Sequence, residues 1–116
     1  MQVDNTLRSK RPAVLWVSPA MTIGAVAERL RSTDVGAMIV SNDGEALQGL
    51  ISERDIAQGL AVHGAALLSL KVQDLMTRSV ISCSPEDNIA DIARIMTMRR
   101  IRHIPVVENG RVVGVI

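Results

Sequence analysis

The chain has 116 residues, a formal net charge of +1 and 47% hydrophobic residues, which fits one compact globular domain and gives no reason to expect binding to nucleic acid or to an acidic membrane. Phe and Tyr are absent and Trp16 is the only aromatic residue, so the chain has no stacking platform for single-stranded nucleic acid. Because Cys83 is the only cysteine, no secretory signal pattern opens the sequence and no apolar run approaches the about 18 to 20 residues of a membrane span, we expect a cytoplasmic protein.

The first predicted elements are a short strand and an amphipathic helix. Residues 14–17 are apolar and end at Ser18-Pro19, and proline favours an extended conformation in the residue before it. A helix follows, because apolar residues recur at the i, i+3, i+4, i+7 spacing of one buried face. These residues are Ile23, Val26, Ala27 and Leu30.

Two strands and a second helix come next. Residues 37–40 and 47–51 are apolar and flank a turn at residues 42–45. Ser52 then opens a helix that carries Ile56, Ala57 and Leu60 on one face. It should end near His63-Gly64, where glycine can act as a cap. Residues 65–71 are expected to form a short linker.

The same order of elements is then repeated in the second half of the chain. A helical turn at residues 72–77 leads to a predicted strand at residues 80–81, and Pro85 lies 66 positions after Pro19 (85 − 19). The next helix has Asn88 as a candidate N-cap, and strands at residues 104–107 and 112–116 flank Asn109-Gly110, a strong hairpin signal. The helix stripe has the spacing of the first copy: Ile89, Ile92, Ala93 and Met96.

The second copy stops at Ile116, at the point where the first copy continues into Ser52 and its helix. A strand that ends there would leave the apolar face of this copy without its covering helix. We therefore expect that the sequence is incomplete at this end and that Ile116 is not the natural terminus.

This repeated order, with Ser-Pro before the first helix and Gly49-Leu50-Ile51-Ser52-Glu53-Arg54-Asp55 after the hairpin, resembles the CBS domain. The tandem arrangement resembles a CBS pair, with one repeat at residues 8–64, a linker at 65–71 and a second repeat, lacking its last helix, at 72–116. The resemblance implies an α/β (α+β) fold in which two β-α-β-β-α repeats pack about a pseudo-twofold. It also implies a stand-alone regulatory module and not an enzyme, with clefts for an adenosine-containing ligand (AMP, ADP, ATP, NAD or S-adenosylmethionine).

The resemblance further implies which residues hold that ligand. Asp55 would accept hydrogen bonds from the ribose hydroxyls and Ser52 would contact ribose or phosphate. Aliphatic side chains would sandwich the adenine, and cationic side chains would face the phosphates. The candidate ligand-binding residues are Asp55, Ser52, Arg102, His103, Ile81, Val80, Leu50 and, more weakly, Arg54. Gly36-Ala37 occupies the place of Arg102-His103 in the first copy, so one cleft is expected to be competent.

Simpler interpretations stay open for several of these residues. Ser52-x-x-Asp55 has the spacing of a capping box that needs no ligand. Arg99, Arg100 and Arg102 stand at a predicted helix C-terminus, where cations complement the helix dipole. The alternative function is accordingly a ligand-free structural association module.

Other sites are not expected. His63, His103 and Cys83 lack the spacing of metal ligands, and Cys83 occupies the place of Val17, which indicates a small apolar role. No catalytic set of side chains is recognisable. We expect a homodimer formed through the helical faces, and a regulated partner protein.

Overall fold

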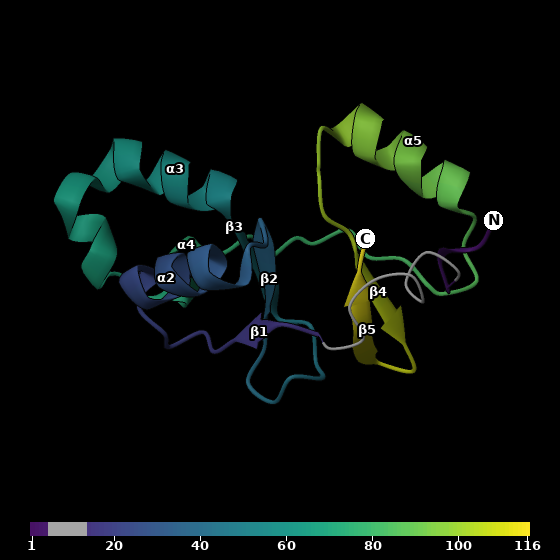
Figure 1. Cartoon of the computed structure of the whole chain (residues 1–116), viewed down its shortest axis with the longest axis horizontal. Coiled ribbons are helices and arrows are strands. Elements are labelled where there is room, and N and C mark those ends of the chain that lie inside the picture. Colours follow the sequence, from purple (N-terminus) through teal and green to yellow (C-terminus); the bar gives the residue numbers. More distant parts are fainter. Residues whose placement is uncertain (5–13) are drawn as a thin grey trace. The chain divides into compact units, whose positions relative to one another are not determined.

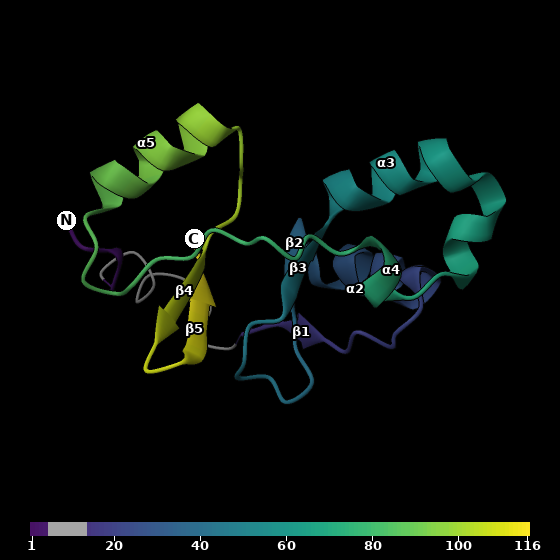
Figure 2. The same cartoon turned by 180° about the vertical axis from the view of Figure 1, so that it is seen from behind.

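The chain folds into two compact units, seen from opposite sides in Figures 1 and 2. The structure is a computed structural model that describes residues 1–4 and 14–116. The continuous unit comprises Leu15–Ser79, and the composite unit joins Met1–Val14 to Val80–Ile116. The expected repeat boundaries differ from this division, because residues 65–79 lie in the continuous unit. Residues 8–13 of the expected first repeat fall outside the described residues.

The continuous unit is a three-stranded sheet with helices. Strand order is β1-β2-β3, with β1 parallel to β2 and β2 antiparallel to β3. The helices α3 and η1 follow each other and turn back toward α2 (Figures 1 and 2). The elements are β1 (Trp16–Val17), α2 (Ile23–Thr33), β2 (Ala37–Val40), β3 (Gly49–Ser52), α3 (Glu53–His63), the 3-10 helix η1 (Gly64–Ser69) and α4 (Val72–Leu75).

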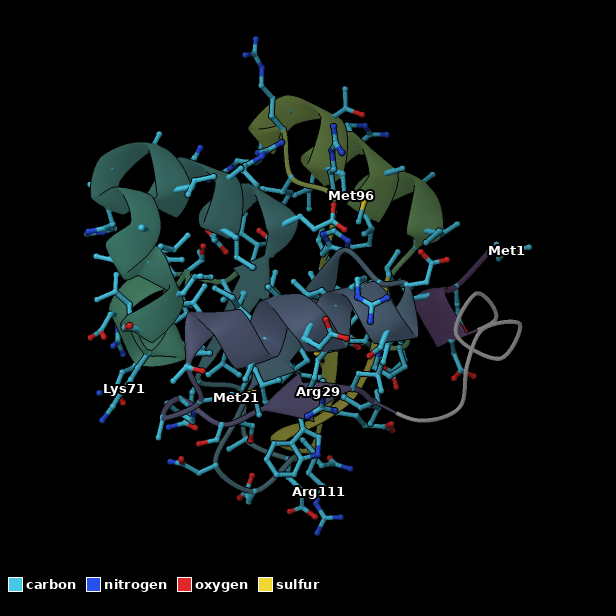
Figure 3. The ribbon with its side chains drawn as sticks, turned by 60° about the vertical axis from the view of Figure 1, so that its left-hand side comes forward. Met1, Met21, Arg29, Lys71, Met96 and Arg111 are labelled. Atoms are coloured by element: carbon cyan, nitrogen blue, oxygen red, sulfur yellow. The ribbon has the colours of Figure 1, made fainter. Side chains whose placement is uncertain are left out.

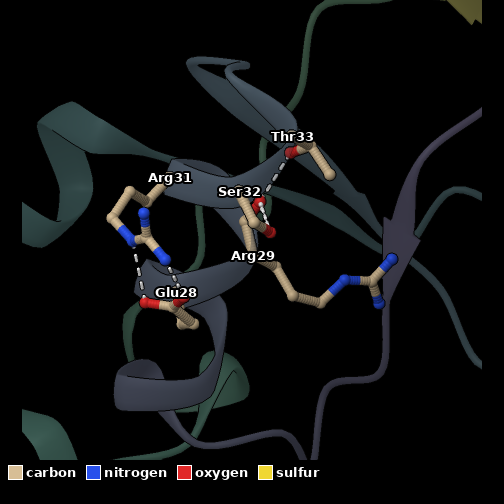
Figure 4. A network of polar contacts seen from close by, with 5 residues as sticks. All are labelled: Glu28, Arg29, Arg31, Ser32 and Thr33. Atoms are coloured by element: carbon tan, nitrogen blue, oxygen red, sulfur yellow. Dashed lines mark hydrogen bonds and ion pairs between the residues drawn. The ribbon is translucent and has the colours of Figure 1, made fainter.

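Helix α2 confirms the predicted amphipathic stripe. Ile23, Val26 and Leu30 are buried in the core of this unit, and the Thr22 side chain caps the helix by accepting from the Ala25 N–H. On the outer side Arg31 pairs with Glu28 (Figure 4), which lowers the pKa of that exposed carboxyl.

Helix α2 is also joined to β1 by a polar contact. The side chain of Arg29 extends from the helix toward the strand (Figures 3 and 4). There its Nη1 donates to the Trp16 carbonyl at 3.3 Å. This contact adds to the apolar packing of the stripe, because hydrogen bonds from charged donors are stronger than neutral ones.

The loop between β2 and β3 is held by its own side chains. Ser41 is fully buried, and its Oγ donates to Asp43 Oδ1 at 3.0 Å and accepts from the Gly44 N–H at 3.0 Å. Asp43 also accepts backbone N–H groups from Ala46 and Glu45, which lowers the pKa of its carboxyl. The Trp16 ring lies against Gly44, where a Cβ would approach Trp16 Nε1 to 2.7 Å. The turn predicted at residues 42–45 is therefore part of a loop that side-chain hydrogen bonds stabilise.

The composite unit contains α5 (Ile89–Arg99), β4 (Pro105–Glu108) and β5 (Arg111–Val115), with β4 antiparallel to β5. Asn88 is the N-cap as predicted, because its side chain accepts from the Ala90 N–H. The Asn-Gly hairpin is also confirmed, with Asn109 and Gly110 at φ of 53° and 77°. The N-terminal segment joins this unit, since Val3 is fully buried and donates to the Asp87 carbonyl at 2.8 Å.

The strand predicted at residues 80–81 does not form. In the other unit the Ile39 N–H donates to the Leu15 carbonyl. Its counterpart, 66 positions later, is Pro105, which has no N–H to donate. Only an isolated parallel bridge between Cys83 and Val106 remains, with Cys83 N–H donating to Pro105 O at 2.9 Å. The prediction was wrong because residues 80–81 align with residues 14–15, which precede β1, and because Pro105 cannot donate the bond that would extend the pairing beyond Cys83.

The predicted linker is structured and belongs to the continuous unit. Residues 64–69 form η1, and Leu67 is buried in the core of this unit. The helical turn expected after the linker is α4, which is tied back to the same unit because Val72 N–H donates to Met21 O at 2.8 Å. The chain therefore completes the continuous unit with the linker and with the first residues of the predicted second repeat.

We predict that Gly49→Ala destabilises the continuous unit by about 1 to 3 kcal/mol, the usual cost of overpacking a close contact. A Cβ at Gly49 would lie 2.8 Å from the Thr77 carbonyl oxygen and 3.0 Å from Met76 Sδ. Chemical denaturation measures the change in the free energy of unfolding. The control is Gly24→Ala in α2, whose Cβ would meet nothing closer than 3.4 Å and which should be neutral or stabilising. Equal effects at both glycines would contradict the close approach.

Candidate functional site

The centre of the candidate site is a capping box where β3 passes into α3. Asp55 Oδ2 accepts from the Ser52 N–H at 3.0 Å, and Ser52 Oγ accepts from the Asp55 N–H at 3.2 Å. The Ser52 hydroxyl also lies 3.0 Å from Asp55 Oδ2. The capping interpretation of Ser52-x-x-Asp55 is thus confirmed, and it fixes the orientation of the carboxylate.

Thr77 is a further member of this site that the sequence did not reveal. Its Oγ1 donates to the other carboxylate oxygen, Asp55 Oδ1, at 3.1 Å. Thr77 is placed by two backbone hydrogen bonds with Leu50, both of 2.9 Å. Leu50, Ser52, Asp55 and Thr77 therefore come together within the continuous unit.

This arrangement leaves a well-defined acceptor. Asp55 and Ser52 are half-buried, whereas Thr77 is exposed. A carboxylate offers about four lone-pair sites, and Ser52 takes up those of Oδ2 while Thr77 uses one on Oδ1. The remaining acceptor on Oδ1 is suited to a hydroxyl or amine donor of a ligand.

The other candidate residues lie in the composite unit. Val80 and Ile81 precede the bridge residue Cys83, and Ile81 packs against the core of this unit while remaining half-buried. Arg102 is exposed and His103 is half-buried, directly before β4. Continuing the parallel register of Cys83 with Val106 backward aligns residues 80–81 with residues 103–104. On this register we expect the apolar and the cationic candidates to lie near the same end of the β4-β5 sheet.

The structure describes the two groups of candidates separately. It brings Leu50, Ser52 and Asp55 together in one unit, and it places Val80, Ile81, Arg102 and His103 in the other. Arg54 is exposed in the first turn of α3. That the two groups serve one ligand stays a prediction.

Two of the arginines have the helix-end position that was the alternative to ligand binding. Arg99 is in its last turn and Arg100 is the C-cap in the left-handed conformation, with φ of 55°, and both are exposed. Helix-end cations complement the dipole without a ligand. Among the described residues no group of three or more His, Cys, Asp and Glu is placed to hold a metal ion. Within the same described ranges no helix is long and apolar enough to cross a membrane.

Cys83 is buried and its thiol is not activated. Burial, with a smaller effect of the Asp87 charge, raises the pKa of Cys83 to about 11. Burial disfavours the charged thiolate, which is the nucleophilic form. This supports the small apolar role expected from its alignment with Val17.

We predict that Cys83 in the folded chain reacts with a thiol reagent at pH 8 at least about a hundredfold more slowly than in the unfolded chain, since each pKa unit above the pH lowers the thiolate fraction tenfold. Reaction with Ellman's reagent, with and without denaturant, measures the two rates. The Cys83→Ser variant gives the background. Equal rates in the folded and unfolded chain would contradict the burial of this thiol.

Comparison with known proteins identifies the fold. The family model described as CBS domain matches residues 9–62 and again residues 72–116. The chain belongs to the CBS domain family. It has a mixed α+β fold with two CBS repeats, and CBS domain proteins are generally regulatory modules rather than enzymes.

Individual relatives agree with this assignment. The chain is 35% identical over 98% of its length to the mitochondrial CBS domain-containing protein CBSX3 of Arabidopsis thaliana, of which it spans 59%. The crystal structure of the CBS-domain containing protein ATU1752 from Agrobacterium tumefaciens matches all of this chain and 92% of that one, with a TM-score of 0.95 and 35% identity. A CBS domain protein, PAE2072 from Pyrobaculum aerophilum, was solved complexed with AMP; it matches 100% of this chain and 86% of that one, with a TM-score of 0.84 and 27% identity.

Proposed function

We propose that this chain is a regulatory module that binds an adenosine nucleotide and is not an enzyme. The observation that carries the proposal is the half-buried Asp55 carboxylate, which the capping box orients at the N-terminus of α3 and which keeps an acceptor on Oδ1. A carboxylate held in this way is suited to ribose hydroxyls. The AMP complex of the related protein from P. aerophilum supports the same ligand class for this chain.

The adenine would be held by aliphatic side chains and backbone groups. Leu50 lies beside Thr77 in one unit, and Val80 and Ile81 precede the bridge residue Cys83 in the other. Because Pro105 lacks an N–H, it cannot give the Ile81 carbonyl the bond that Ile39 gives the Leu15 carbonyl. We propose that this carbonyl accepts from the adenine amino group.

The phosphates would be bound by the cationic pair before β4. Arg102 is exposed and can meet a phosphate bidentately, and His103 adds positive charge when protonated. The equivalent Gly36-Ala37 of the first repeat offers no charge. From this inequality of the two repeats we expect one competent nucleotide site, to which Asp55 and Arg102 both contribute.

The regulatory effect would follow from linkage. A nucleotide that prefers one arrangement of the repeats shifts the population toward it by the difference in its affinities. A partner protein that recognises this arrangement would then respond to the nucleotide. We expect this to take place in the cytoplasm, where a reducing milieu suits the free Cys83.

We predict that AMP, ADP, ATP, NAD or S-adenosylmethionine raises the melting temperature of the chain. A ligand at a hundredfold excess over its dissociation constant adds about 2.7 kcal/mol of stability, a rise of about 10 °C for a domain of this size. Asp55→Asn and Arg102→Ala should each reduce the shift strongly. If no nucleotide at millimolar concentration moves the melting temperature, the ligand-free association module is the better account, since the capping box is complete without a ligand.

A matched control separates ligand binding from helix capping. Asp74 occupies the same local role, because its Oδ2 accepts from the Lys71 N–H at 3.0 Å at the start of α4. Asp74→Asn removes the same charge from the same unit and should leave the nucleotide-induced shift unchanged. Equal losses in Asp55→Asn and Asp74→Asn would show that Asp55 acts only as a cap.

We further propose that the chain forms a homodimer through helical faces. Leu60 of α3 and Met98 of α5 are 57% and 75% exposed, and exposed large apolar side chains on helices are typical of association surfaces.

We predict that Leu60→Glu and Met98→Glu convert a dimer into a monomer, because a charge buried at an interface without a partner is unfavourable. Light scattering after size-exclusion chromatography measures the mass. Gln58→Glu, on the exposed surface of the same helix α3, is the control and should stay dimeric. A monomeric wild type at micromolar concentration would refute the dimer.

A further inference from the structure

The hydrogen-bonding capacity of Asp55 is nearly used up before any ligand arrives. Oδ2 is engaged by both the backbone N–H and the hydroxyl of Ser52, and Oδ1 by the hydroxyl of Thr77. About four lone-pair sites are available on a carboxylate. One acceptor position is therefore left, on Oδ1, whereas a ribose with two neighbouring hydroxyls needs two.

The donors around Asp55 differ in how easily they can leave. The Ser52 N–H belongs to the backbone between β3 and α3, and the Ser52 hydroxyl also accepts from the Asp55 N–H. Displacing the Ser52 N–H opens the capping box, which costs about 1 kcal/mol. The Ser52 oxygen is held by the Asp55 N–H and stays 3.0 Å from Oδ2 even when its proton turns away, so this side of the carboxylate remains occupied. Thr77 is exposed, and its hydroxyl can leave Oδ1 by a rotation about χ1 that does not disturb its backbone bonds to Leu50.

We propose that Thr77 determines how strongly the site distinguishes ribose from deoxyribose, because its hydroxyl occupies the acceptor that the second sugar hydroxyl requires. A deoxyribose, with one of the two neighbouring hydroxyls missing, binds to the remaining acceptor and leaves the Thr77–Asp55 bond intact. A ribose gains its second hydrogen bond only by breaking that bond. The second hydroxyl therefore contributes little in the wild type. This inference rests on the proposed nucleotide binding at Asp55.

Removal of the competing hydroxyl tests the inference. In Thr77→Val the side chain keeps its branched shape but cannot donate, so both ribose hydroxyls can reach Asp55 without competition. The affinities of AMP and 2′-deoxy-AMP are measured by calorimetry for the wild type, Thr77→Val and the control Thr77→Ser, which retains the hydroxyl. The ratio of the AMP affinity to the 2′-deoxy-AMP affinity should rise about fivefold in Thr77→Val, as expected for one net hydrogen bond. It should stay at the wild-type value in Thr77→Ser.

The outcomes separate this inference from the proposed function. If wild type and both variants bind AMP but the ratio in Thr77→Val is unchanged or lower, Thr77 does not compete with the sugar and the inference is wrong while nucleotide binding stands. An equal loss of affinity for both nucleotides would likewise overturn it, since that pattern indicates a purely structural role. Failure of every form to bind either nucleotide, with circular dichroism showing that each is folded, would overturn both. Binding of AMP by Thr77→Val alone would support the competition most strongly.

Discussion

Two backbone hydrogen bonds between Leu50 and Thr77 hold the candidate site in place. They bring the chain that leaves α4 alongside β3, at the point where β3 passes into α3. The approach is possible because Gly49 has no side chain, since a Cβ there would lie 2.8 Å from the Thr77 carbonyl oxygen. Once the segment is held, the Thr77 hydroxyl meets Asp55, and the capping box sets the direction of that carboxylate. The site thus depends on a contact between segments more than twenty residues apart, and not on the local motif alone.

The two repeats have diverged into unequal parts. The continuous unit contains the oriented Asp55 carboxylate, and the composite unit contains the exposed Arg102 and the half-buried His103. Pro105 is a difference in the backbone itself. It lacks the N–H that its counterpart Ile39 donates to the Leu15 carbonyl in the continuous unit. The chain has no Phe or Tyr, and the ring of its one aromatic residue, Trp16, lies against Gly44. The proposed adenine contacts are therefore aliphatic side chains and the Ile81 carbonyl, to which Pro105 cannot donate.

Much of the fold could be predicted from local patterns. The 3.6-residue period located α2 and α5, Ser52 and Asn88 marked helix starts, and Asn109-Gly110 marked the hairpin. These signals are reliable because each acts within a few residues along the chain. The loss of strand pairing in the second repeat is also predictable from the sequence, since Pro105 takes the position of Ile39.

Long-range contacts could not be predicted in this way. Leu67 and Val72 read as parts of a linker and of a second repeat, but both are buried in the core of the continuous unit. No local pattern in the sequence distinguishes Thr77. Only the tertiary structure brings it to the Asp55 carboxylate, 22 residues away. Ser52 and Asp55 could be named as candidates from their spacing, but the number of acceptors left on Asp55 could not.

The central claim is that Asp55 and the cationic pair before β4 serve one adenosine nucleotide. A titration of the ¹⁵N-labelled chain with AMP, followed by amide chemical shifts, tests it most directly. The account predicts the largest changes at Leu50, Ser52 and Thr77 in the continuous unit and at Ile81 and Arg102 in the composite unit, with one common dissociation constant. Changes confined to one of the two groups, or no changes at millimolar AMP, would contradict it.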